Sequence, residues 1–408
     1  MKRTILAILF CIIGMAVFAQ GADMSFISRE FFRTDGTFAE RLEILQSVRE
    51  AEMTGIGEFY HEALRYVIRR MPDIGSFQDR VAAVEAARIL CQGIGAERHS
   101  AAAPELWEIV QFADVVRDVN DGLLMQDALI ALGQVGAAEF VPHIALRLRN
   151  FNDSVTADVE TRRRIQRGVA GCIIALETLQ EIEGYRPVFM ASVGWYDPAI
   201  RTIAQLALPN ITDDPSDVII EIIRDPSVIP SIKLTAWNEL LRSQAPDASK
   251  ARAASAALAT GWFVHTNDPS DIRILREMRI SAINVIRQLG AADDSVYVNL
   301  ERSYRQNFTS PAPHFEEIRV TLAALSALGT DRAVGLLMGF LRELHERRRA
   351  GIWTHRERDV FSWVIPSLGA TRTQLPEARF LLNTIQRSGD FTSAEQIWAR
   401  DALRALGN

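Results

Sequence analysis

The six-residue motif A-L-x-A-L-G occurs three times in this 408-residue chain, and its spacing constrains the fold strongly. The three copies end at Gly133, Gly329 and Gly407. These glycines are 196 and 78 residues apart, close to five and two multiples of about 39. Leu-Gly pairs ending at Gly290 and Gly369 fall in the same register. The spacing therefore predicts a structural repeat with a period near 39 residues.

Residues 315–345 show what one repeat contains. Ile318, Leu322 and Leu325 have the i, i+4, i+7 spacing of a helix with one apolar face. Gly329 follows where that helix should end, because glycine adopts the left-handed C-terminal conformation at little steric cost. A second apolar stripe, starting near Val334, predicts an antiparallel partner helix. The same helix end is predicted at the repeat glycines Gly133, Gly290, Gly329, Gly369 and Gly407.

The repeat predicts an all-α fold, since no strand-like alternation persists anywhere. A single helix pair cannot bury its apolar face, whereas stacked pairs share a continuous core. We expect an α-α superhelix (α-solenoid) of about nine stacked antiparallel helix pairs over residues 75–408, preceded by a helical cap over 20–74. Asp-Pro pairs at 197, 214, 225 and 268 predict helix starts, because aspartate caps free amides and proline suits the first turn.

This pattern resembles the HEAT-repeat (armadillo-type) superfamily, in particular its short variety that ends in an ALG turn. Like many repeats of that family, some units place an arginine early in the first helix, at Arg279, Arg319 and Arg358. The resemblance is strongest over residues 120–150 and 275–408. It implies a right-handed superhelix whose surface binds other proteins. Some members of the superfamily are instead enzyme subunits that act on a bound prosthetic group.

The N-terminus has the composition of a secretory signal peptide. Lys2 and Arg3 precede an apolar run, and Val17-Phe18-Ala19 places small residues at −3 and −1, so we expect a signal peptide over 1–19 with cleavage after Ala19. The run is shorter than the roughly 20 residues that span a bilayer. The sequence therefore predicts a periplasmic or secreted protein without stable membrane insertion.

Two cysteines, Cys91 and Cys172, remain after that cleavage. An even number in an oxidising compartment suggests a disulfide. However, the two cysteines lie about two repeats apart, and stacked helices are about 8–10 Å from each other. That separation exceeds the roughly 7 Å between Cα atoms that a disulfide allows. We expect two buried free thiols.

No catalytic constellation is evident in the sequence. None of the seven histidines forms H-E-x-x-H, and the grouping with the closest spacing is His345 and His355. Motifs typical of a P-loop, a nucleophile elbow or a C-x-x-C site are absent. The net charge of −6 argues against a general nucleic-acid binder, which needs positive surface to neutralise phosphates. We therefore expect a non-enzyme without a cofactor or bound metal.

The second helices of the repeats carry the candidate binding residues. An arginine-rich groove for an acidic protein partner is one interpretation, and arginines that complement helix dipoles are the other. Exposed aromatic side chains would serve as contact anchors. The candidates are Arg147, Arg149, Arg302, Tyr304, Arg305, Arg342 and Trp353. The sequence favours a non-catalytic exported scaffold for an unknown protein partner in the cell envelope. The alternatives are the enzyme-subunit role and a carbohydrate-binding envelope protein.

Overall fold

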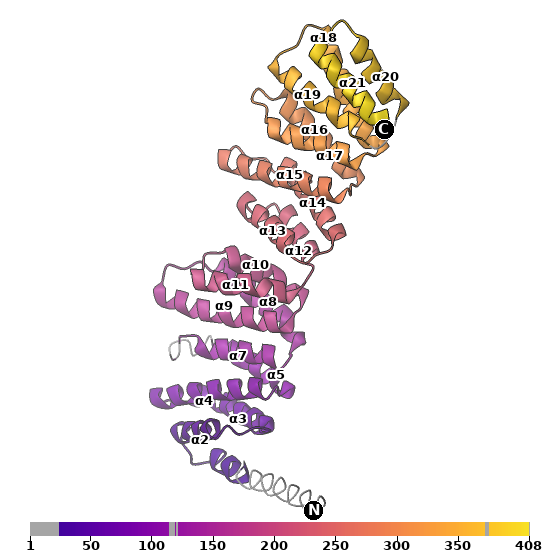
Figure 1. Ribbon diagram of the computed structural model, residues 1–408. Helices are drawn as coiled ribbons and strands as arrows, with labels where there is room; N and C mark the ends of the chain where they lie inside the picture. Colours follow the sequence, from indigo (N-terminus) through magenta and orange to yellow (C-terminus); the bar gives the residue numbers. More distant parts are fainter. Residues whose placement is uncertain (1–23, 114–118, 120, 372–374, 408) are drawn as a thin grey trace, which may run out of the picture. The chain divides into compact units, whose positions relative to one another are not determined.

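The computed structural model describes residues 24–113, 119, 121–371 and 375–407, and their regular secondary structure is entirely helical (Figure 1). The all-α class is therefore confirmed for this part of the chain. The predicted signal peptide over 1–19 lies outside the described residues. Within them, no helix combines the length and the apolar character that a bilayer crossing requires.

The chain divides into two compact units, Met1–Thr212 and Asp213–Asn408, here called the N-terminal and C-terminal units. The N-terminal unit begins with helical residues 24–31, and the predicted boundary at residue 74 falls in the connection between η1 and α4. Its further helices are α2 (Phe38–Glu50), α3 (Gly57–Arg70), η1 (Met71–Asp73), α4 (Phe77–Ala96), η2 (Ser100–Ala102), α5 (Ala103–Phe112), α7 (Leu123–Gln134), η3 (Ala138–Phe140), α8 (Val141–Asp153), α9 (Val159–Leu179), η4 (Ile182–Gly184), α10 (Tyr185–Val193) and α11 (Pro198–Ile211).

The C-terminal unit consists of α-helices, without 3₁₀ segments among its described residues. They are α12 (Ser216–Arg224), α13 (Pro230–Arg242), α14 (Asp247–Phe263), α15 (Pro269–Leu289), α16 (Asp294–Thr309), α17 (Phe315–Leu328), α18 (Asp331–Arg349), α19 (His355–Gly369), α20 (Pro376–Arg387) and α21 (Ser393–Gly407).

Within each unit a helix packs against its neighbour in sequence and against the helix two places further on. In the N-terminal unit, α2, α4, α7, α9 and α11 contact one another in that order, with α3, α5, α8 and α10 beside them. In the C-terminal unit, α13, α15, α17, α19 and α21 form one such row, and α12, α14, α16, α18 and α20 form the other. This sequential pairwise packing is consistent with an α-solenoid.

The helix pair α17–α18 shows why these segments fold as the repeat predicts. The stripe Ile318, Leu322 and Leu325 is fully buried, and so are Leu337, Leu341 and Leu344 on α18. Helix α17 ends at Leu328, and the amide of Gly329 (φ +57°) donates to the carbonyl of Leu325. Gly290 ends α15 in the same way with φ +63°. At these two glycines the backbone has the conformation that the motif predicts.

The helices also end at Gly133 and Gly369 to within one residue, but the predicted left-handed conformation is wrong there, because both glycines have ordinary helical backbone. Their role is steric instead. A Cβ on Gly133 would lie 2.9 Å from Cα of Ala175 on α9, and one on Gly369 would lie 2.7 Å from Cα of Ala402 on α21. These glycines let neighbouring backbones approach. Gly407 also lies within a helix, as the last residue of α21.

The Asp-Pro pairs start helices at three of four sites. Asp268 accepts hydrogen bonds from the amides of Ser270 and Asp271 at the start of α15. Asp214 accepts one from the amide of Ser216 at α12, and α11 begins at Pro198 directly after Asp197. Asp225 is the exception, because its carboxylate accepts from Ser227 in a turn, and α13 begins only at Pro230.

Cys91 and Cys172 are free thiols and both are fully buried. Cys91 lies within α4 and Cys172 within α9, with α7 packed between those helices. The intervening helix keeps the thiols apart, as their spacing by repeats suggested.

Candidate binding site

The seven predicted partner-binding residues are divided between the two units. Arg147 and Arg149 lie on α8 of the N-terminal unit, and the other five lie on or just after α16 and α18 of the C-terminal unit. Arg149 and Arg342 are exposed, and Arg147 is half-buried over the ring of Phe151. Arg305 forms ion pairs with Glu301 at 2.8 Å and Glu343 at 3.2 Å, so its charge is compensated within the unit.

Tyr304 is not an exposed contact anchor, and that prediction is wrong. Its side chain is fully buried and stacks on Phe340 with ring centroids 3.7 Å apart. The reason is helical periodicity, because Tyr304 lies four residues after Leu300 and eight after Val296 on the buried face of α16. Burial strongly raises the pKa of the Tyr304 hydroxyl, so it stays neutral.

Trp353 is half-buried and holds the end of the C-terminal unit together. Its ring packs edge-on against Phe361 and Phe391, and its indole N–H donates to Glu395 over 3.3 Å. The guanidinium of Arg348 lies 4.9 Å from the ring centroid. These contacts occupy much of the surface that a partner would need.

Arg302 lines a pocket of about 560 Å³ in the C-terminal unit. The end of α14 contributes Trp262 and Phe263, the middle of α15 contributes Arg276 and Arg279, and α16 contributes Arg302. Three successive helices thus surround one cavity. Half of the remaining lining residues are polar, namely His265, Thr266, Gln306, Asn307 and Ser310.

Arg279 forms the base of this pocket, and the carboxylate of Glu317 compensates its positive charge. It is buried, and its Nε and Nη2 donate to the two carboxylate oxygens of Glu317 on α17 over 2.7 and 2.9 Å. Its third contact, from Nη1, is to the carbonyl of Gly261 over 2.8 Å. A Cβ on Gly261 would lie 2.4 Å from Cγ of Arg279, so glycine is required for this fit. Arg279 therefore links α15 to α14 and to α17.

The indole ring of Trp262 completes the base. It lies beneath the Arg279 guanidinium, which is 3.9 Å from the ring centroid, and its N–H donates to Ser303 over 2.8 Å. These contacts fix the ring, as cation–π and hydrogen-bonding partners do together. The pocket base is therefore rigid before any ligand arrives.

Arg276 and Arg302 differ from Arg279, because neither has an ion pair or a hydrogen bond to another described residue. The Nε atom of Arg276 is buried and makes no hydrogen bond. Arg302 lies over Phe263, 4.9 Å from the ring centroid, and Phe263 is 62% exposed. Burial together with the positive charge of Arg276 lowers the pKa of nearby His314. The pocket thus presents two guanidinium groups that lack an anion, beside exposed aromatic surface.

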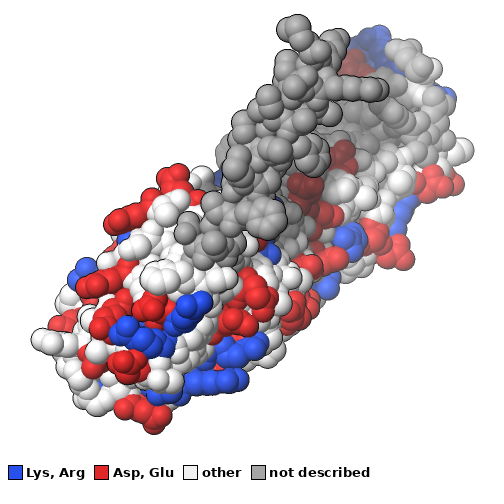
Figure 2. Space-filling model, turned by 90° about the horizontal axis from the view of Figure 1, so that it is seen from below, with Lys and Arg blue, Asp and Glu red and all other residues white. Residues whose placement is uncertain are grey.

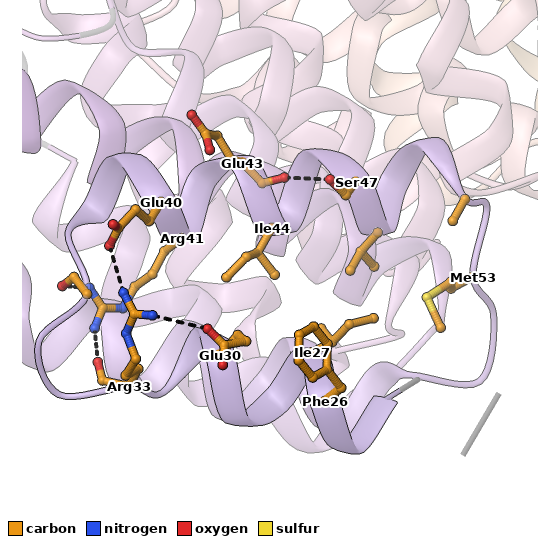
Figure 3. A pocket seen from close by; sticks show the side chains of 13 residues that line it. Phe26, Ile27, Glu30, Arg33, Glu40, Arg41, Glu43, Ile44, Ser47 and Met53 are labelled. Atoms are coloured by element: carbon orange, nitrogen blue, oxygen red, sulfur yellow. Dashed lines mark hydrogen bonds and ion pairs between the residues drawn. The ribbon is translucent and has the colours of Figure 1, made fainter. Parts of the chain in front are cut away.

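A second pocket, of about 660 Å³, lies in the N-terminal unit between helical residues 24–31 and α2. Its apolar side chains include Phe26, Ile27, Ile44 and Met53, which face the space between the two helices (Figure 3). Its cations are already paired. Arg33 forms ion pairs with Glu30, Asp35 and Glu40.

Arg41 of the same pocket is almost fully buried and serves the local fold. Its guanidinium donates to the carbonyls of Phe31, Arg33 and Gly36 and to the hydroxyl of Tyr66. These bonds close the connection between the first helical residues and α2. Because the side chains of Arg33 and Arg41 are already paired, this pocket offers an apolar groove and not a charged site.

Charge is mixed over the face of the molecule that Figure 2 shows. Acidic and basic side chains alternate there, and the described residues form no broad single-sign patch in that view. The charge on this face therefore does not by itself mark a binding site.

The described residues define an all-α protein built from sequentially packed helices. No protein-family model matches the chain, and no curated protein matches it. Among solved structures, the chain is similar to human deoxyhypusine hydroxylase in complex with glycerol, at 15% identity and a TM-score of 0.24, over 87% of this chain and 99% of that one. A TM-score of this size carries no inference about function.

Sequence reasoning identified Arg279 and Arg302 but missed Arg276, Trp262 and Phe263. Trp262 and Phe263 end a long alanine-rich helix, and bulky aromatic residues at such a place were the available signal. Nothing in the local sequence shows that Arg276 lacks an acidic partner, because that depends on which helices pack around it.

Proposed function

We propose that this chain is an exported, non-catalytic scaffold that binds an acidic segment of a partner protein in the pocket beside Arg276 and Arg302. In this proposal the chain is a HEAT-like α-solenoid of about nine helix pairs with a period near 39 residues. The observation that carries the proposal is the pair of guanidinium groups without an anion, next to exposed Phe263.

An acidic peptide suits this pocket for chemical reasons. Arginine binds carboxylates through two parallel N–H···O bonds, and such charge-assisted bonds are the stronger kind. The rim ring of Phe263 supplies apolar contact for an adjacent side chain. Arg279 takes no direct part, since Glu317 already holds both of its carboxylate-facing nitrogens.

The first experiment uses two labelled peptides, hexaglutamate and hexaglutamine, and measures fluorescence anisotropy with the purified mature chain. We expect hexaglutamate alone to bind, and more weakly as salt is added. The Arg276→Ala/Arg302→Ala variant should lose at least about tenfold in affinity, because each charge-assisted bond contributes about 1.5–3 kcal/mol. The control is Arg242→Ala, an exposed α13 residue whose guanidinium forms an ion pair with Glu239.

The second experiment places a photo-crosslinking residue at Gln306, which lines the pocket. In intact cells it should capture a protein whose yield falls in the Arg276→Ala/Arg302→Ala background. Equal binding of both peptides would contradict the proposal. So would a crosslinking yield that is unchanged in the Arg276→Ala/Arg302→Ala variant. Retention of a glycan by the purified protein, with no captured protein, would favour the carbohydrate-binding alternative.

A further inference from the structure

A second site lies in the N-terminal unit, away from the arginine-lined pocket. We propose that Glu58, His61 and His99 bind one divalent transition-metal ion, with Zn²⁺ as the ion that fits this ligand set. One ligand atom from each of the three side chains lies within 4.8 Å of the other two. No spacing in the sequence suggests this group, because it comes from α3 and from the connection between α4 and η2.

Local structure explains how the three side chains meet. Glu58 and His61 are three residues apart in the first turns of α3 and therefore share one face of that helix. His99 follows the end of α4 and reaches back toward α3, and its ring centroid lies 5.3 Å from that of His61. A Cβ on Gly57 would lie 3.0 Å from the His99 ring, so the glycine makes room for it.

The polar atoms of the cluster are incompletely satisfied. Nε2 of His99 is buried and makes no hydrogen bond, and the nearest acidic oxygen, on Glu58, is 3.4 Å away. A buried imidazole nitrogen in this state calls for a partner such as an ion or a water molecule. Glu58 is itself exposed, so it is free to complete a coordination shell.

Glu105 on α5 supports the site from the other side. Its carboxylate lies 3.0 Å from Nε2 of His61, as the outer-shell partners of metal-bound histidines do. Arg65 lies 2.9 Å from Glu105 and 3.1 Å from His61, so Glu105 compensates the positive charge of Arg65 beside the site.

Arg98, the residue before His99, has a left-handed backbone conformation that favours glycine. Arg98 has φ +51°, and it follows α4 where Gly136, with φ +75°, follows α7 one repeat later. A non-glycine residue disfavours this conformation, because its Cβ comes close to the following carbonyl oxygen. The strained residue directly precedes the candidate ligand, as strained residues at functional sites often do.

The chemistry of the ligands selects the class of ion. Neutral imidazole and carboxylate suit Zn²⁺ and its transition-metal neighbours, whereas Ca²⁺ and Mg²⁺ prefer oxygen ligands alone. Two histidines and one glutamate leave a further coordination position open. A bound ion would also link α3 to the α4–η2 connection and so stabilise the N-terminal unit.

The test is calorimetric titration of the untagged, chelator-treated mature chain with Zn²⁺. We expect one saturable site, and a melting temperature that rises with Zn²⁺ and falls again with EDTA. Glu58→Gln and His99→Ala should each weaken Zn²⁺ binding at least about tenfold. His355→Ala, which changes an exposed histidine at the start of α19 in the C-terminal unit, serves as the control and should bind like the parent.

Glu58→Gln is the decisive variant because its side chain is exposed and isosteric, so it folds even if His99→Ala does not. Circular dichroism of each variant without metal verifies the fold. Absence of a saturable site in the parent would overturn the proposal. So would a site whose affinity is unchanged in Glu58→Gln and in a folded His99→Ala.

Discussion

At Gly133 the backbone of α7 comes so close to α9 that no side chain fits between them. The same six-residue motif ends a helix at Gly329, where the backbone takes the left-handed conformation. One glycine therefore serves interhelix contact and the other serves chain reversal. The two roles impose different penalties on substitution.

The contact role can be tested with two glycines in helix interiors. Gly133→Ala places a Cβ 2.9 Å from the Ala175 backbone, so α7 and α9 must separate. We expect it to lower the free energy of unfolding by about 1–3 kcal/mol, as overpacking does. Gly335→Ala in α18 meets no atom within 4 Å and should instead raise it by about 0.5–1 kcal/mol. Thermal unfolding followed by circular dichroism measures both, and equal effects would contradict this assignment.

Single residues show what the sequence could and could not predict. The apolar stripe of Ile318, Leu322 and Leu325 follows from helical period, and all three are buried. The same helical spacing of four residues, applied from Leu300, would have placed Tyr304 in the core. The steric role of Gly133 was not predictable, because the approach of Ala175 depends on the packing of α9.

Between elements, the strongest polar link is Arg279 on α15 with Glu317 on α17. Both side chains are buried, and removal of one partner leaves the other charge uncompensated. We expect Arg279→Ala to cost about 3–5 kcal/mol of stability. The Arg279→Met/Glu317→Leu double variant should cost less than Arg279→Met or Glu317→Leu alone, because it leaves neither charge unpaired. A double-mutant cycle by urea denaturation measures this, and additive losses would show that the pair is not coupled.

A helix cap makes the stability of the C-terminal unit depend on pH. Burial would raise the pKa of Asp293 at the start of α16, but bonds from Ser295, the Val296 amide and Ser255 outweigh it and lower the pKa. The fold therefore favours the carboxylate. Its stabilisation is present above the ordinary aspartate pKa of about 3.9 and is lost as the pH falls through the lower folded value.

Asp293→Ala should accordingly lower the stability of the chain by about 0.5–2 kcal/mol at neutral pH. The difference in melting temperature from the parent should shrink as the pH is lowered from about 6 to about 3. Glu346→Ala removes an exposed carboxylate of α18 and should show no such convergence. A difference that stays constant for Asp293→Ala would argue against this cap.

The candidate site depends on relations between elements, which explains why only part of it was predictable. Arg302 was identified as a polar residue on a second helix, whereas Arg276 contributes through its lack of an acidic neighbour. Glu58 and His99 are likewise 41 residues apart in sequence, about one repeat, and meet only through the packing of α3 against α4. Periodicity predicts the helices but not which polar side chains face one another.

For the molecule as a whole, the two units have distinct reporters of unfolding. Cys91 and Cys172 both belong to the N-terminal unit, and five of the seven tryptophans belong to the C-terminal unit. Burial raises the pKa of Cys172 to about 12 and that of Cys91 further, so neither thiol reacts in the folded protein.

We therefore expect the mature chain to react with a thiol reagent only once its N-terminal unit unfolds. In a urea titration, thiol reactivity and tryptophan fluorescence should have different midpoints, because each unit has its own core. Coincident midpoints would show that the two units unfold together. The cysteine-free Cys91→Ala/Cys172→Ala variant provides the background rate.

The close-contact glycines also bear on how such a chain changes length. Gly95 on α4 and Gly133 on α7 are 38 residues apart, and each admits the backbone of the next row helix, at Ala131 and Ala175. A genetic crossover between these two positions would remove or duplicate one helix pair while keeping a glycine at the contact. Such a change in length would therefore preserve the close backbone contact between neighbouring row helices.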